Sequence, residues 1–199
     1  MNEEEDKEEK AAFEIPEEFH SMSTGGKFER CIDCDRYLLD ENEEYFIEKA
    51  IKKYPGFKAQ DVIFEYAICI HCAERMRSEM STESLNSLET YMMENTDIAR
   101  RMEIVQANPN NPLAWMQECL IKGVSQEELT EYQIYAHCQG DKLNLMQMPY
   151  MVSSIALDEI SQLLSDKTLD QLNGFMDEHF GPPPELKEPL PSRRRVILV

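Results

Sequence analysis

Large apolar side chains recur at every second position along the segment 61–69, the period of a β-strand. The apolar side chains at every second position are Val62, Phe64, Tyr66 and Ile68. Such alternation places them on one face of a strand. The run EYFIEKAIKKY, residues 44–54, precedes them and is separated by Pro55-Gly56, a turn signal. The pattern predicts a β-hairpin over residues 44–69.

After residue 72 the spacing of apolar residues changes to three and four, which is typical of helices. The positions are Ala73, Met76, Met80, Leu85, Leu88 and Met92. A further amphipathic run, DIARRMEIVQ, ends at ANPNNP, where Asn and Pro interrupt the helical period. We therefore expect helices up to about residue 106 and a boundary between two lobes near residue 108.

The second lobe is predicted to begin with a helix. Asn111 is a candidate N-cap, Pro112 suits the first helical position, and Gly123 is a stop signal. Residues 131–152 then read as two strands around Gly140-Asp141, a hairpin signal. Two helices follow, because apolar residues recur at helical spacing over 156–164 and 169–180.

These elements predict an α+β fold in four segments. Residues 1–26 are an acidic flexible tail, and 27–108 form a four-cysteine zinc-finger lobe with a helical extension. Residues 109–181 form a small α+β lobe of a helix, a β-hairpin and two helices. Residues 182–199 are a Pro-rich linker followed by a basic and apolar C-terminal tail.

Composition narrows the functional classes. Apolar residues make up 42% of the 199 residues, enough for a core. The formal net charge of -19 repels phosphate backbones and anionic lipids. The N-terminus MNEEEDKEEK lacks the basic start of a signal peptide, and no apolar run approaches the roughly 20 residues of a membrane span. We expect a soluble cytoplasmic protein without membrane contact, in which thiols stay reduced.

Two Cys-x-x-Cys pairs carry the clearest chemical signal. Cys31, Cys34, Cys69 and Cys72 provide four thiols, and zinc favours four thiolates in a tetrahedron. Two intervening residues allow both sulfurs of a tight turn to reach one ion. The four cysteines are therefore predicted to bind one structural Zn²⁺. A closed shell of four thiolates has no position for a reactive water, which argues against metal catalysis.

The order of a cysteine knuckle, a hairpin and a second pair at a helix start resembles a treble-clef zinc finger. The resemblance covers roughly residues 28–82 and implies a structural metal site without indicating a substrate. One departure is the separation of Cys34 from Cys69 by 34 residues, against roughly 15 to 20 in compact zinc ribbons. Either the inserted hairpin is long, or the two pairs do not share one metal.

The remaining His and Cys residues are predicted to have other roles. His71 is expected to be exposed or beside the metal shell, and His20 solvated in the tail. His137 and Cys138 are adjacent in a strand, so they point to opposite faces and do not share an ion. Cys119 is expected to pack as a small apolar residue. His179 lies near a helix C-terminus, where the helix dipole favours an imidazolium.

Three functions remain open. The first is a protein-interaction, adaptor or regulatory module built on the zinc site. The second is a nucleic-acid-associated regulator that uses a lysine-rich hairpin tip, Lys49, Lys52, Lys53 and Lys58. The third is a thiol redox protein, which requires a metal-free cysteine pair. No phosphate-binding loop, H-E-x-x-H or G-x-S-x-G sequence occurs, and an enzyme is the less favoured reading.

Overall fold

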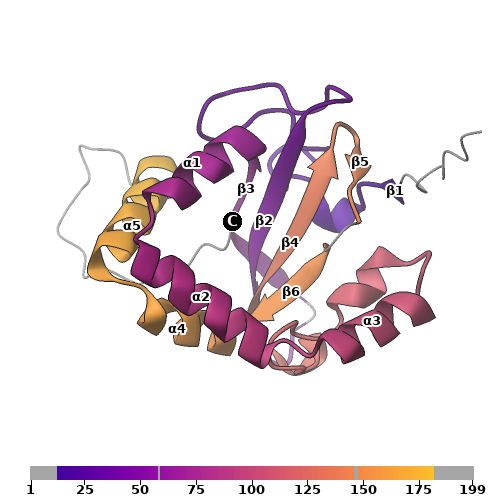
Figure 1. The fold of residues 1–199 in the computed structure, drawn as a ribbon. Coiled ribbons are helices and arrows are strands. Elements are labelled where there is room, and N and C mark those ends of the chain that lie inside the picture. The colour runs from indigo at the N-terminus through magenta and orange to yellow at the C-terminus, as the bar shows by residue number, and fades with distance from the viewer. Residues whose placement is uncertain (1–12, 58, 146–147, 182–199) are drawn as a thin grey trace, which may run out of the picture.

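The fold is α+β, as expected, and centres on a six-stranded antiparallel sheet (Figure 1). The computed structural model describes residues 13–57, 59–145 and 148–181. The strand order is β1-β5-β4-β2-β3, and β6 also pairs with β4. The strands are β1 (Phe13–Glu14), β2 (Glu44–Lys53), β3 (Gln60–Cys69), β4 (Glu131–Gln139), β5 (Lys142–Leu143) and β6 (Tyr150–Ser153).

The hairpin predicted over 44–69 is confirmed as β2 and β3. Each strand has ten residues, and the register places Tyr45 opposite Cys69 at the base. Gly56 in the connecting turn has a φ of 84°, a backbone conformation that favours glycine. The register shifts between Ala50 and Ile51, where one extra residue of β3 forms a bulge.

The sheet is built from both predicted lobes. β4, which belongs to the segment 109–181, pairs with β2 from Glu44 opposite Gln139 to Lys52 opposite Glu131. β2 is therefore central, and β3 is the edge strand on that side. The division of the chain into two lobes near residue 108 stays a prediction. The treble-clef topology is not shown, because the hairpin forms part of this larger sheet.

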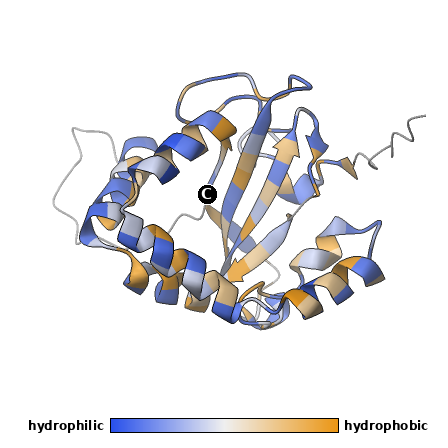
Figure 2. Cartoon of the chain, in the orientation of Figure 1, coloured by the Kyte–Doolittle hydropathy of each residue, from blue (hydrophilic) through white to orange (hydrophobic). Residues whose placement is uncertain are grey.

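The two faces of the sheet carry different side chains, and blue and orange segments alternate along β2 and β4 (Figure 2). One face carries Glu48 of β2 with Tyr66 and Tyr135 opposite it on the neighbouring strands. The other face carries the odd-numbered residues of β2. There Lys49 donates to the carbonyl oxygen of His20 at 2.6 Å, so the N-terminal segment lies over that face.

The described part of the chain contains five α-helices. They are α1 (Ile70–Glu79), α2 (Thr82–Asn95), α3 (Ile98–Ala107), α4 (Ser154–Leu163) and α5 (Asp166–Phe180). Ser81, Ser153 and Ser165 cap α2, α4 and α5 by accepting a backbone N–H with the side chain. α1, α2, α4 and α5 gather on one side, and α3 lies beyond β6 (Figure 1).

The helix predicted from Pro112 to Gly123 is wrong beyond its first turn. Only Pro112–Met116 is helical, as a 3-10 turn, and Asn111 makes no side-chain cap bond. The chain then pairs with the sheet, because Leu120 donates its backbone N–H to the carbonyl oxygen of Met151 at 2.8 Å. Pairing with β6 thus prevails over the local helical signal.

The strand predicted after Gly140-Asp141 is interrupted. β5 has two residues and β6 four, and both pair with β4 at different positions along it. Gly140 has a φ of 54°, consistent with its predicted turn. The proline at position 149 lies just before β6 and removes one backbone donor from this stretch.

The prediction of a flexible tail through residue 26 is wrong for residues 13–26. β1 pairs with β5, and Phe19 of a short 3-10 turn (Glu17–Phe19) is fully buried. His20, expected to be solvated, is half-buried and its Nε2 lies 3.1 Å from the carbonyl oxygen of Ile15. Apolar residues within the acidic stretch explain the packing. Residues 1–12 and the segment 182–199 lie outside the described residues.

Candidate metal centre

The first cysteine pair lies on a tight turn between two bridged residues, Arg30 and Tyr37. The backbone N–H of Cys31 donates to the carbonyl oxygen of Arg36 at 2.9 Å, and that of Asp35 donates to Cys31 at 3.0 Å. Asp35 has a φ of 58°, which an Asp tolerates better than most side chains. These bonds close the loop and place the thiols of Cys31 and Cys34 on its inner side.

The second pair lies where β3 becomes α1. Cys69 is the last residue of β3 and the N-cap of α1, and Cys72 is in the first turn of that helix. The first N–H groups of a helix have no partner within the helix, and the helix dipole is positive at this end. Both effects favour thiolate over thiol at this position, whereas burial of Cys69 and Cys72 opposes ionisation.

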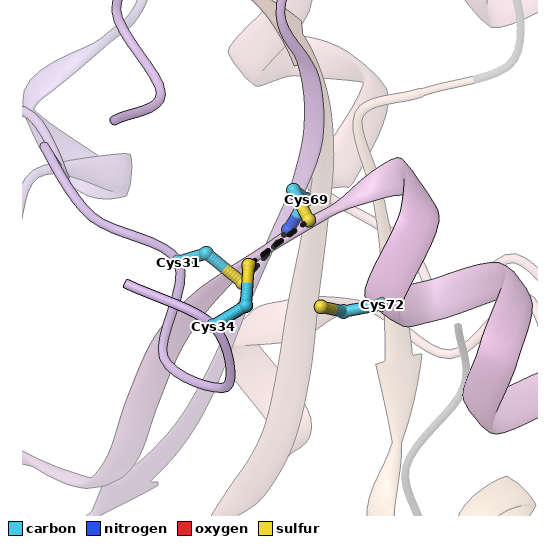
Figure 3. A group of neighbouring side chains, drawn as sticks. All are labelled: Cys31, Cys34, Cys69 and Cys72. Carbon is cyan, nitrogen blue, oxygen red and sulfur yellow. Dashed lines mark hydrogen bonds between the residues drawn. The ribbon is translucent and has the colours of Figure 1, made fainter. Parts of the chain in front are cut away.

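The hairpin brings the two pairs together despite the 34 residues between them. β2 and β3 run out and back over equal lengths, so Cys69 returns to the level at which β2 began. Two backbone contacts then join the turn to the strand. Ile32 donates its N–H to the carbonyl oxygen of Ala67 at 2.9 Å, and Cys69 donates its N–H to the sulfur of Cys31 at 3.3 Å (Figure 3).

The four cysteines form one cluster that could hold a metal ion. Their Sγ atoms all lie within 4.8 Å of one another, and those of Cys34 and Cys69 are 3.7 Å apart (Figure 3). A tetrahedral zinc site with Zn–S bonds of about 2.3 Å has sulfurs about 3.8 Å apart. The arrangement therefore fits a four-thiolate zinc site. Cys31, Cys69 and Cys72 are buried, and Cys34 is exposed.

The thiols differ in how readily each ionises. Burial raises the pKa of Cys34, but hydrogen bonds from the Arg36 backbone and neighbouring thiols outweigh it, and the pKa falls to about 7. Burial raises the pKa of Cys69, and burial together with a hydrogen bond to Asp33 raises that of Cys72. The neighbouring cysteines Cys31 and Cys34 add to this rise, so ionisation of one thiol disfavours that of the next, and a divalent cation would remove the conflict.

Two charged residues beside the cluster were not identified from the sequence. Nη2 of Arg75 lies 3.8 Å from the sulfur of Cys72 and forms an ion pair with Asp33. A divalent ion with four thiolates would carry a net charge of about −2, and a guanidinium at this distance would offset part of it. The sequence spacing could have identified Arg75, because it follows Cys72 by three residues and therefore lies on the same helix face.

The other His and Cys residues lie apart from the cluster. His71 is exposed, as expected. Cys138 is fully buried, whereas Nε2 of His137 lies 2.9 Å from the Glu44 carboxylate, so their placement on opposite faces is confirmed. Cys119 is buried and its sulfur lies 3.3 Å from the Ser153 hydroxyl. His179 lies in the last turn of α5, and its ring packs on Phe175 with centroids 4.5 Å apart.

The lysines proposed for nucleic acid do not form one exposed patch. Lys49 is 3% exposed and pairs with Glu65 at 3.0 Å. Lys52 lies on the opposite face of β2, where it pairs with Glu131 at 2.6 Å. Lys53 donates to the carbonyl oxygen of Gln126 at 2.7 Å, and Lys58 lies outside the described residues. Nucleic-acid binding stays a prediction that none of these contacts supports.

No protein-family model, curated protein or solved structure matches this chain. Within the described residues, no helix is long and apolar enough to cross a membrane.

Proposed function

We propose that this protein binds one zinc ion through Cys31, Cys34, Cys69 and Cys72, and that the ion has a structural role. The observation that carries the proposal is the approach of all four sulfurs to within 4.8 Å. Zinc would link the 31–36 turn to the end of β3 and the start of α1, adding to the hydrogen bonds that already join them. Residues 28–82 then correspond to a treble-clef-like unit with an enlarged hairpin.

A structural role is favoured over catalysis by the donor set. Four thiolates complete the coordination of zinc, and no position remains for an activated water or a substrate. The energetic consequence is large, because apparent zinc affinities of roughly 10 to 16 kcal/mol in finger peptides contribute directly to folding. All six cysteines are unpaired, which suits a reducing compartment such as the cytoplasm.

The zinc-ordered turn is also the surface that we propose for binding another protein. Tyr37 is 41% exposed, and the guanidinium of Arg30 lies 5.7 Å from the centre of its ring. Tyr and Arg are enriched at protein interfaces, since each combines apolar area with a polar group. The proposal is thus an interaction or adaptor module whose recognition surface depends on the metal.

Metal content is the deciding experiment. Protein purified without chelator or affinity nickel is analysed by mass spectrometry as wild type, Cys31→Ser, Cys72→Ser and Cys119→Ser. We expect about one zinc per chain, lost in the first two variants. Cys119→Ser is the matched control, because Cys119 is buried but outside the cluster, and it should retain zinc. A folded, metal-free wild type with reversible oxidation of these thiols would instead support the redox hypothesis.

Partner binding is tested separately. Zinc-loaded wild type is used for affinity capture in the presence of nuclease, alongside Tyr37→Ala and Tyr54→Ala. Tyr54 is the control because it has a similar exposure, 39%, but lies at the far end of the hairpin. Loss of a captured protein in Tyr37→Ala alone supports the proposed surface. Equal capture by both variants would contradict it.

A further inference from the structure

A groove of about 840 Å³ runs beside the outer edge of β3. Apolar side chains line it on both sides: Phe28 and Ile32 from the N-terminal segment, and Val62, Phe64 and Phe180 from β3 and the end of α5. Ile63 of the same strand is 51% exposed. This is an apolar channel along a strand that has no neighbour on one side in the sheet order.

The backbone of this edge is available for pairing. Within the described residues, one backbone hydrogen bond reaches the outer side of β3, from Ile32 to the carbonyl oxygen of Ala67. That bond shows that Ala67 directs its backbone groups outward. Backbone groups of an edge strand point outward at alternate residues, so those of Glu65 do so as well. An apolar edge of this kind is an aggregation hazard unless another segment covers it.

We propose that the C-terminal segment Val196–Val199 of the same chain covers this edge as an added strand. Residue 180, where α5 ends, is itself part of the groove wall, with the Phe180 ring centroid 5.6 Å from that of Phe64. The chain therefore leaves α5 at the groove. The residues that follow, 182–199, lie outside the described part of the chain.

The length of the intervening chain suits this placement. Eleven residues, PPPELKEPLPS, lie between Gly181 and Arg193. At about 3.1 Å per residue in an extended proline-rich conformation they span roughly 34 Å. The edge of a ten-residue strand is about 33 Å long. The linker can therefore reach any point along β3, and its prolines reduce the entropy lost on docking.

The composition of the segment fits the groove. Val and Ile have high β-propensity, and all four residues of VILV are apolar. A strand with two apolar faces is buried on both sides, and this groove has apolar walls on both sides. Arg193, Arg194 and Arg195 precede it and are attracted to a chain whose net charge is -19.

The test is hydrogen exchange by mass spectrometry on zinc-loaded protein, comparing the full chain with a chain that ends at Ser192. Removal of the last seven residues should accelerate exchange of the outward-pointing amides within 61–66, that of Glu65 among them, at least about tenfold. Exchange in β4, whose backbone is paired with β2, should not change. Full-chain Ile197→Pro should reproduce the truncation, since proline lacks the N–H that a ladder needs. Lys187→Pro, in the linker, is the matched control and should retain protection.

The outcomes separate the possible occupants. Equal exchange at 61–66 in the full and truncated chains would overturn the proposal, as would acceleration by the same factor throughout β2 and β4. Protection that increases with protein concentration would also overturn it, in favour of pairing between two copies. Zinc content is measured in every sample, so failure of the metal site is recognised independently of failure of the strand.

Discussion

The hydroxyl of Tyr66 donates a 2.6 Å hydrogen bond to Oε2 of Glu48, across the β2–β3 hairpin. Both side chains are 1% exposed, and they lie directly opposite in the register. Burial raises the pKa of Glu48 to about 8, against the lowering effect of hydrogen bonds from Tyr66 and Tyr135. A carboxyl group that is ionised in the unfolded chain at neutral pH is thus protonated in the core.

This carboxyl group predicts a pH dependence of stability. An ordinary Glu loses its proton near pH 4.5, whereas Glu48 in the folded protein holds it up to about pH 8. The folded state therefore binds more protons in that window, and stability falls as pH rises through it. The total change is on the order of a few kcal/mol. Urea denaturation of the zinc-loaded protein between about pH 6 and 8 measures this slope.

Glu48→Gln should flatten that pH dependence, because glutamine keeps an acceptor for the Tyr66 hydroxyl but has no proton to lose. Glu128→Gln, at an exposed position, is the control and should retain the wild-type slope. An unchanged slope in Glu48→Gln would show that Glu48 is not the group responsible.

The buried ion pair of Lys49 and Glu65 predicts strong coupling between the two residues. Their charged atoms are 3.0 Å apart, and the side chains are 4% and 14% exposed. Lys49→Met should cost about 3 to 5 kcal/mol of unfolding free energy, because Glu65 then loses its buried countercharge. The double variant with Glu65→Met should lose less than the sum of the single variants. Additive losses in a denaturation cycle would contradict the coupling.

α3 is held to the rest of the protein mainly by arginines, since none of its own residues is buried. Arg101 donates to the carbonyl oxygens of Trp115 and Pro149 at 2.7 and 2.6 Å, and its guanidinium lies over the Trp115 ring. Arg101→Ala should release α3 and expose the single tryptophan, with a red shift of its fluorescence and normal zinc content. Arg77→Ala, on exposed surface, is the control. An unshifted spectrum in Arg101→Ala would count against this anchoring.

Replacement of glycine by alanine is expected to have opposite effects on stability at two positions. A Cβ at Gly140 would lie 3.1 Å from the carbonyl oxygen of Asp40, and the φ of 54° strains any L side chain. Gly140→Ala should lower the unfolding free energy by about 1 to 2 kcal/mol. Gly174 lies inside α5 with nothing within 4 Å of its Cβ position. Gly174→Ala should raise the unfolding free energy by about 0.5 to 1 kcal/mol, and thermal denaturation measures both changes. A higher unfolding free energy in Gly140→Ala than in the wild type would show that the backbone at position 140 does not disfavour a side chain.

The sequence predicted those parts of the fold whose signal is local. Alternation along 61–69 identified β3, and the doubled Cys-x-x-Cys identified residues that the structure does bring together. The pairing of β2 with β4 could not be predicted, because nothing local specifies which distant strand completes a sheet. For the same reason the second lobe appeared independent of the first.

The errors have related physical causes. The helix after Pro112 was cut short by hydrogen bonds to β6, a tertiary contact that local capping signals do not report. Lys49 appeared to be part of a basic patch because charged residues are usually solvated, yet its partner Glu65 lies on the neighbouring strand. Phe19 and Ile15 were overlooked because the surrounding carboxylates dominate the composition of the N-terminal segment.

The central position of β2 has a consequence for synthesis on the ribosome. All four cysteines are present once Cys72 has been made, so the proposed metal site could form early, from the 31–36 turn, the hairpin and the start of α1. The second neighbour of β2 begins only at Glu131. In the interval β2 is an unsatisfied strand on a nascent chain, and a metal-closed hairpin would keep it in register until β4 emerges.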